Sequence, residues 1–244
     1  MSKWLNQTVG QIVVEDYKTA SVFQNYGIDF CCNGNRSLKE ACEKKGVEEQ
    51  KLISALESIA VQNSIDTTNY SSWPIDLLAD YIEKKHHRYV ESRIPELRAY
   101  LGKISKVHGG NHPELKEIEV LFSACAGELS MHMKKEEIVL FPYIRKMVAA
   151  QINHQELDAP HFGSVNNPIQ MMMHEHNTEG ERFRRIADLS GQYHPPKDAC
   201  NTYKVAFSML KEFEDDLHLH IHLENNILFP KAQALEQKLM SNDM

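Results

Sequence analysis

Hydrophobic positions recur every three to four residues along most of the chain, and no stretch of useful length alternates apolar and polar residues. That spacing is typical of amphipathic helices with one buried face, whereas a half-buried strand would alternate with a period of two. Glycine and proline pairs, at Gly109-Gly110 and Pro195-Pro196, separate the longest helical patterns. We therefore predict an all-α protein whose C-terminal part is a four-helix bundle.

The N-terminal part of the chain predicts a separate group of short helices. Thr8 and Ser37 each stand three positions before a Gln or Glu, which is the capping-box pattern of a helix start. Residues 63–72 are polar and lack helical spacing, so they predict a linker. We expect a small helical domain at residues 1–62 and a bundle domain at residues 73–240. Because about 60 residues bury only a small core, the first domain is expected to dock on its neighbour or to form a homodimer.

One motif occurs twice in the predicted bundle. His132 and Glu136 are followed by a Leu-Phe-Pro segment, and His220 and Glu224 are followed by the same segment. Each element of the first copy lies 88 positions before its counterpart in the second. A His and a Glu four apart lie on one face of a helix, about 6 Å apart along its axis. Each copy can therefore offer a nitrogen and an oxygen to one metal ion.

Two further histidines precede the motifs at matching distances. His87 lies 45 residues before His132, and His176 lies 44 residues before His220. The midpoint of the first pair falls on the glycine pair, and that of the second falls just after the proline pair. In a helical hairpin, residues equidistant from the turn lie at the same height. Four helices should therefore bring six metal ligands to one level: His87, His132, Glu136, His176, His220 and Glu224.

This ligand set favours a particular kind of metal site. Six ligands are too many for a closed tetrahedral zinc site, but they are enough for two metal ions if the carboxylates bridge. An imidazole-rich set with some oxygen ligands suits iron better than calcium or magnesium, which prefer oxygen alone. The spacing of four with His first also differs from the Glu-x-x-His motif of ferritin-like sites. The residues thus predict a two-metal centre that favours iron.

Three acidic residues precede a predicted ligand histidine by four positions: Glu83, Glu128 and Asp216. A ligating histidine usually donates its other ring N–H to an oxygen, so these carboxylates are candidates for that role, although acids on long helices are mostly solvated. His218 and His222 are also four apart, but they lie on a different face of the helix from the predicted ligand between them. We expect these two histidines at the surface or beside the ligands.

Composition narrows the possible partners and the compartment. The chain has 27 basic and 34 acidic residues, and this net charge of −7 argues against a nucleic-acid or acidic-membrane partner. No apolar run approaches the roughly 20 residues that span a bilayer, and the N-terminus lacks the apolar core of a secretory signal. The five cysteines do not resemble a disulfide framework. These features favour a cytoplasmic protein.

The adjacent Cys31 and Cys32 form a second candidate site. They are followed by Asn-Gly, and a thiol near a helix N-terminus could be activated. The alternative is a pair of small, half-buried residues at a helix end. Both interpretations stay open at this point, because thiol reactivity depends on exposure and on the thiol pKa.

These residues together resemble a known family. The paired motifs with their preceding histidines resemble hemerythrin-like di-iron domains, and Asp29-Phe-Cys-Cys-Asn-Gly34 resembles the small ScdA-type domain. Their combination resembles the iron–sulfur cluster repair di-iron proteins of the ScdA and YtfE type. The resemblance implies a non-haem di-iron centre with His87, His132, His176 and His220 as terminal ligands, and with Glu136 and Glu224 as bridges alongside an oxo group.

The resemblance also implies a function. The expected role is to restore iron–sulfur clusters damaged by nitric oxide or peroxide, by donating iron to damaged iron–sulfur proteins or their scaffold. Glu128 and Glu175 would line a route to the centre, and Cys31 or Cys32 could receive or relay iron. These four residues are the candidates for a catalytic role. The same ligands could instead support a nitric oxide or peroxide reductase, or an oxygen or nitric oxide sensor, so enzymatic activity stays open.

Overall fold

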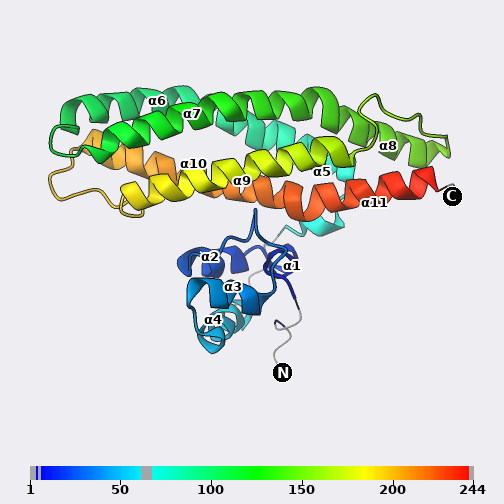
Figure 1. The fold of residues 1–244 in the computed structure, drawn as a ribbon, viewed down its shortest axis with the longest axis horizontal. Coiled ribbons are helices and arrows are strands. Elements are labelled where there is room, and N and C mark those ends of the chain that lie inside the picture. The colour runs from blue at the N-terminus through cyan, green and yellow to red at the C-terminus, as the bar shows by residue number, and fades with distance from the viewer. Residues whose placement is uncertain (1–3, 5–6, 62–67, 242–244) are drawn as a thin grey trace.

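The computed structural model describes residues 4, 7–61 and 68–241. In these residues the regular structure is helical, apart from one isolated bridge between Thr8 and Ser37. The predicted all-α class is therefore confirmed. Figure 1 shows a long helical bundle with the N-terminal helices gathered against its side. None of the described helices is long and apolar enough to cross a membrane.

Two of the N-terminal helices begin where the capping residues predict. The Thr8 side chain accepts a hydrogen bond from the Gln11 N–H at 3.2 Å, and Ser37 accepts one from the Glu40 N–H at 3.2 Å. Gly46 ends the third helix with a φ of 65°, a left-handed conformation that costs glycine little. The helices of this group are α1 (Val9–Glu15), α2 (Thr19–Asn25), α3 (Leu38–Lys45) and α4 (Glu49–Val61).

Four helical rods make up the bundle in the described residues. The first rod is α5 (Ile75–Tyr81), η3 (Ile82–His87) and α6 (Arg88–His108), and the second is α7 (Glu114–Lys135), η4 (Glu136–Leu140) and α8 (Phe141–Asn153). The third is α9 (Asn166–Leu189), and the fourth is α10 (Asn201–Leu223), η5 (Glu224–Leu228) and α11 (Phe229–Met240). Of the predicted linker, residues 63–67 lie outside the described residues, while η2 (Tyr70–Ser72) forms a short 3₁₀ helix.

Three of the rods contain a π-helical turn at the same level of the bundle. The turn η3 ends at His87, whereas η4 begins at Glu136 and η5 begins at Glu224. Pro142 and Pro230 follow η4 and η5 in the first turn of the next helix, and they have no N–H for the helical ladder. Turns of this type are frequent at functional sites, and here each one carries a predicted metal ligand.

The buried hydrophobic side chains form two clusters with the π-helical turns between them. One cluster fills the space between α6, α7, α9 and α10, and it continues into the N-terminal helices through residues such as Phe23 and Phe30. The other lies between α5, α8, α11 and the first turns of α9. The predicted ligands therefore lie in a polar layer between two apolar regions, where burial restrains their positions.

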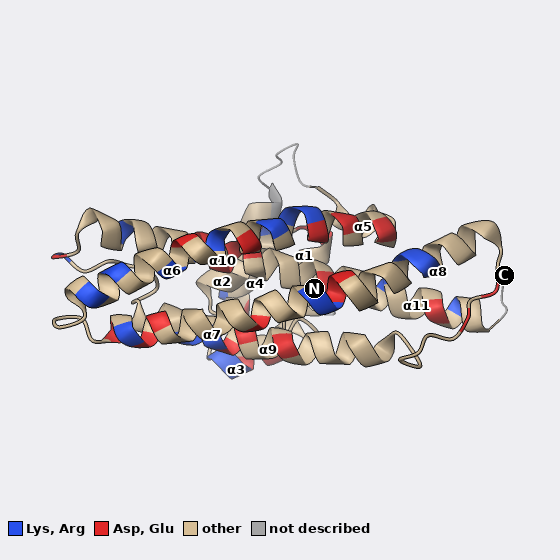
Figure 2. Cartoon of the chain, turned by 90° about the horizontal axis from the view of Figure 1, so that it is seen from above, with Lys and Arg blue, Asp and Glu red and all other residues tan. Residues whose placement is uncertain are grey.

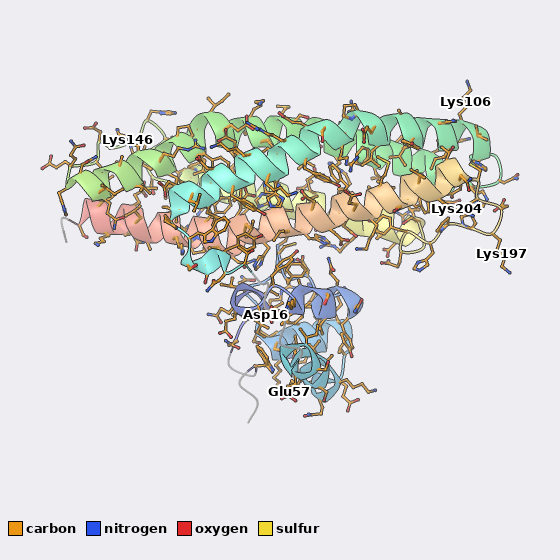
Figure 3. All side chains as sticks on the ribbon, turned by 180° about the vertical axis from the view of Figure 1, so that it is seen from behind. Asp16, Glu57, Lys106, Lys146, Lys197 and Lys204 are labelled. Atoms are coloured by element: carbon orange, nitrogen blue, oxygen red, sulfur yellow. The ribbon has the colours of Figure 1, made fainter. Side chains whose placement is uncertain are left out.

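The N-terminal group docks on the bundle through polar contacts as well as through the shared hydrophobic cluster. Arg184 of α9 lies 3.1 Å from Asp29, and Gln24 of α2 donates to Asp215 of α10 at 3.2 Å. In Figure 3 this group, marked by Asp16, lies beside the middle of the bundle. Docking was one of the two expected outcomes, while formation of a homodimer stays a prediction.

Charged residues of both signs are interspersed along the bundle, as Figure 2 shows. Many of them pair between helices: Arg145 lies 2.7 Å from Asp80, and Arg185 lies 2.8 Å from Glu117. Exposed pairs of this kind contribute only about 0–1 kcal/mol each. Burial of the two hydrophobic clusters, rather than surface ion pairing, is therefore the main source of the bundle's stability.

Candidate metal centre

The six predicted ligands meet in the middle of the bundle, and every one of them is buried. They form two overlapping groups of four, and within each group the ligand atoms lie within 4.8 Å of one another. Glu136 and Glu224 belong to both groups, as expected of carboxylates that bridge two metal ions. The first group adds His87 and His220, and the second adds His132 and His176.

All four imidazole rings turn the same nitrogen, Nε2, towards the Glu136 and Glu224 carboxylates. The Nε2 atoms of His87 and His132 lie 3.3 and 3.4 Å from Oε2 of Glu136. Those of His176 and His220 lie 3.2 and 3.1 Å from the carboxylate oxygens of Glu224. The four Nε2 nitrogens and the carboxylate oxygens of Glu136 and Glu224 thus converge on a small volume.

The unpaired atoms of this cluster fit the donor set of a metal centre. Within the described residues, buried side-chain atoms without a hydrogen-bond partner include both oxygens of Glu136, Oε2 of Glu224 and Nε2 of His87. A buried polar group left unpaired costs about 1–3 kcal/mol, and more when it is charged. Metal ions bound between the two groups would satisfy these atoms together. The residues present therefore fit a two-metal centre.

Three of the ligand rings are oriented by a hydrogen bond from the other ring nitrogen. The Nδ1 atom of His87 lies 3.0 Å from Glu137, and that of His132 lies 2.8 Å from Glu175. The Nδ1 atom of His176 lies 2.9 Å from Oδ1 of Asn225. When Nδ1 carries the proton and donates it to these oxygens, Nε2 keeps its lone pair for a metal. We call Glu137, Glu175 and Asn225 the orienting residues.

The three acidic residues that the sequence offered as candidates for this orienting role do not contact a ligand ring in this way. Glu83 pairs with Arg145, Glu128 pairs with Arg182, and Asp216 lies 3.1 Å from Nδ1 of His86. A residue four positions earlier shares a helix face with the ligand, whereas the outer ring nitrogen turns sideways to the neighbouring helix. The partners therefore come from adjacent rods.

A signal for two of the true partners was present in the sequence. Glu137 and Asn225 each follow a bridging glutamate directly, and they are separated by the same 88 positions as the motifs themselves. The third partner, Glu175, directly precedes the ligand His176.

The charges around the centre favour ionised carboxylates. Burial opposes charge on His87 and His176, but the nearby carboxylates of Glu136 and Glu224 outweigh it and raise the pKa of both histidines to about 9. Burial likewise opposes charge on Glu224, yet the facing histidines hold its pKa well below its usual range. The hydrogen bond from His132 lowers the pKa of Glu175 to about 2. Metal binding to the protonated site would therefore release protons.

A cavity of about 110 Å³ opens beside the second group of ligands. Glu128 and Glu175 line it, as the predicted route to the centre requires, together with His132 and His176. Lys135 bonds Glu175 at the rim. A further acid, Glu179, also lines the cavity and is 3% exposed, and no spacing argument had singled it out. The two candidate route residues thus lie in one space that ends at two predicted ligands.

Cys31 and Cys32 lie in a loop that packs against α9, the helix that carries His176. Cys31 is buried and Cys32 is half-buried, and the N–H groups of both donate to Oδ1 of Asp29 at 3.1 and 2.9 Å. The adjacent Cys32 and burial raise the pKa of the Cys31 thiol well above its usual value, so Cys31 is not an activated thiol. Cys32 Sγ donates to the carbonyl oxygen of His176 at 3.4 Å. The loop therefore touches the backbone of a predicted metal ligand.

His218 and His222 lie at the junction with the N-terminal group and belong to neither ligand group. His218 lies 3.3 Å from the Gln24 amide. His222 is 1% exposed, and its ring packs against Tyr17 and Phe30 at centroid distances of 5.6 and 5.9 Å. The expectation that His222 lies at the surface or beside the ligands is therefore wrong, because the docked N-terminal loop covers it.

The fold and this site define a class: a hemerythrin-like four-helix bundle with a two-metal site of buried His and Glu. The family model described as "Hemerythrin HHE cation binding domain" matches residues 79–232. A second model, ScdA_N, described as a domain of unknown function, matches residues 5–60.

Curated relatives narrow the class to a family. The "Iron-sulfur cluster repair protein ScdA" of Staphylococcus haemolyticus is 31% identical over 91% of this chain and 96% of its own length. The "Iron-sulfur cluster repair protein YtfE" of Pectobacterium atrosepticum is 33% identical over 93% of this chain and 96% of its own length. The chain belongs to this iron–sulfur cluster repair family.

Proposed function

We propose that this chain is a di-iron protein that repairs iron–sulfur clusters damaged by nitrosative or oxidative stress, by donating iron in the cytoplasm. The observation that carries the proposal is the pair of buried ligand groups that share Glu136 and Glu224. Four imidazoles with two carboxylates suit iron better than the hard cations that prefer oxygen alone. The names of the relatives support repair as the role.

Each ligand has a distinct part in this proposal. His87 and His220 would hold one iron, His132 and His176 would hold the other, and the two glutamates would bridge them. The bound iron would supply both the redox change and the cargo for repair. The chain itself fixes the ring orientations through Glu137, Glu175 and Asn225, and the histidines that face Glu224 hold the pKa of this carboxylate well below its usual range.

Iron release fits the chemistry of these ligands. Imidazole and carboxylate donors hold iron less firmly than thiolates do, so a thiolate-rich acceptor can take it. The cavity beside His132 and His176 offers a way out that Glu128 and Glu175 line. Cys32 lies against the His176 backbone and could receive or relay the ion. Damaged iron–sulfur proteins or their scaffold are the proposed partners.

A transfer assay with labelled iron tests the proposal. Protein loaded with ⁵⁷Fe is mixed with an iron–sulfur enzyme inactivated by nitric oxide, and activity and label are followed together. We expect recovery in proportion to the iron supplied, with the label in the repaired cluster. His218→Ala serves as a control, because His218 belongs to neither ligand group. Equal recovery with iron-free protein would contradict the proposal.

The cavity favours a second function at the same site. A space of about 110 Å³ beside two predicted ligands has room for a small molecule such as nitric oxide, oxygen or peroxide. Rapid catalytic loss of nitric oxide or peroxide would indicate a reductase, whereas reversible binding without iron transfer would indicate a sensor. Each result is distinguishable from recovery in proportion to donated iron.

A further inference from the structure

One amide side chain connects a predicted metal ligand to the cysteine loop. Oδ1 of Asn225 lies 2.9 Å from Nδ1 of His176, and Nδ2 of the same amide donates to the carbonyl oxygen of Cys31 at 3.1 Å. The thiol of Cys32 donates to the His176 carbonyl at 3.4 Å. The loop is therefore joined to His176 through the ring on one side and through the backbone on the other.

The corresponding position in the first half of the repeat has a different chemistry. Glu137 lies 88 positions before Asn225, and it accepts from Nδ1 of His87 at 3.0 Å. Its second oxygen accepts from Lys134 at 2.6 Å. A carboxylate has no N–H, so it could not donate to a backbone carbonyl. Asn225 both orients the His176 ring and holds the cysteine loop, and an amide, which accepts and donates, can make both contacts.

We infer that Asn225 is a positioning residue that couples metal binding at His176 to docking of the Cys31-Cys32 loop. A metal bound to Nε2 fixes the His176 ring and directs its Nδ1–H at Oδ1 of the amide. The amide group then has one orientation, with its NH₂ towards the Cys31 carbonyl. Without metal, contacts such as that of Nε2 with Glu224 at 3.2 Å still hold the His176 ring, but the ring and the amide lose the additional constraint of a metal bond.

The coupling works in both directions, because linkage between two binding events is reciprocal. Metal binding favours the docked loop, and docking of the loop favours metal at His176. Release of the loop would loosen the metal ligand and expose Cys32 at the same time, so the thiol becomes available when the metal leaves. This inference rests on the proposed metal site, but it does not depend on iron–sulfur cluster repair.

Alkylation of Cys32 measures the state of the loop. The experiment uses the full chain with Cys200→Ser, because Cys200 is exposed and would react first. Iron-free protein and protein loaded anaerobically with ferrous iron are treated with iodoacetamide, and peptide mass spectrometry gives the rate at Cys32. We expect iron to slow this rate about fivefold, the effect of one hydrogen bond of ordinary strength.

Two neighbouring asparagines separate coupling from simple docking. Asn225→Asp keeps an acceptor for His176, as Glu137 provides for His87, but places an oxygen against the Cys31 carbonyl. After loading with saturating iron, checked by metal analysis, Cys32 of this variant should react as fast as in its iron-free form. Asn226 donates to the Phe30 carbonyl at 3.2 Å and is not among the ligand contacts. Asn226→Asp should therefore raise both rates and preserve their ratio.

The outcomes distinguish the coupling from the metal site itself. If the wild-type chain binds iron but Cys32 reacts at one rate in both states, the coupling is wrong and the metal site stands. If Asn225→Asp keeps the wild-type ratio, Asn225 is not the coupling residue. A chain that takes up no iron after reconstitution would contradict the proposed metal site. The wild-type comparison is informative even if a variant folds poorly.

Discussion

Replacing a bridging carboxylate should abolish binding of both metal ions at once. Glu224 contributes to both ligand groups and is fully buried, so Glu224→Ala removes an oxygen from each proposed ion. In the wild-type chain, each bound iron at 100 times its Kd should add about 2.7 kcal/mol to the free energy of unfolding. For a chain of this size each such increment corresponds to a rise in Tm of roughly 5–11 °C. The variant should show no rise.

The metal-free variant should also be less stable than the metal-free wild type. Glu224 lies 3.2 and 3.1 Å from the Nε2 atoms of His176 and His220, and removing one partner of a buried pair costs about 3–5 kcal/mol. Differential scanning fluorimetry with and without ferrous iron measures both effects, and metal analysis gives the stoichiometry. His218→Ala is the matched control and should keep the iron-dependent rise. A Glu224→Ala protein that keeps this rise would refute the bridging role.

Three further predictions concern the surroundings of the centre. Glu175→Ala should weaken iron binding about 10- to 100-fold in a chelator competition, because it removes the acceptor that orients His132, whereas Glu181→Ala at an exposed position should not. Alkylation of Cys200 should reach half its maximal rate near pH 7, because backbone N–H groups and His108 lower the pKa of this thiol to about 7, and His108→Ala should move the midpoint upwards. Phe213→Ala should lower the free energy of unfolding by about 3–5 kcal/mol in urea titrations while leaving the iron stoichiometry unchanged, because Phe213 is buried in the cluster away from the ligand layer.

The ligand layer could be predicted because its geometry follows from local rules. The spacing of four between His132 and Glu136 places both on one helix face, and the distance to each turn sets the height of the preceding histidine. These relations hold for any antiparallel hairpin with regular helices. The π-helical turns did not disturb them, since η4 and η5 begin at the glutamates themselves.

The orienting contacts could not be predicted by the same rules. The acceptor for Nδ1 of His132 depends on how α7 and α9 are rotated about their axes. The spacing of residues along the sequence does not specify that rotation. The same holds for His222, whose burial depends on the docking of Phe30 from a distant segment. Only the repeat offered help, because it pairs Glu137 with Asn225.

The repeat explains the ligands, and its departures from symmetry explain why the two ligand groups differ. Asn225 replaces the carboxylate of Glu137 on the side where the cysteine loop packs. The cavity lined by Glu175 also touches His132 and His176, the two histidines of the second group. A thiol loop and an open space therefore adjoin the same metal position. Under the proposed function, in which the chain holds iron and gives it up, these neighbours make the second position the one from which exchange with an acceptor would begin.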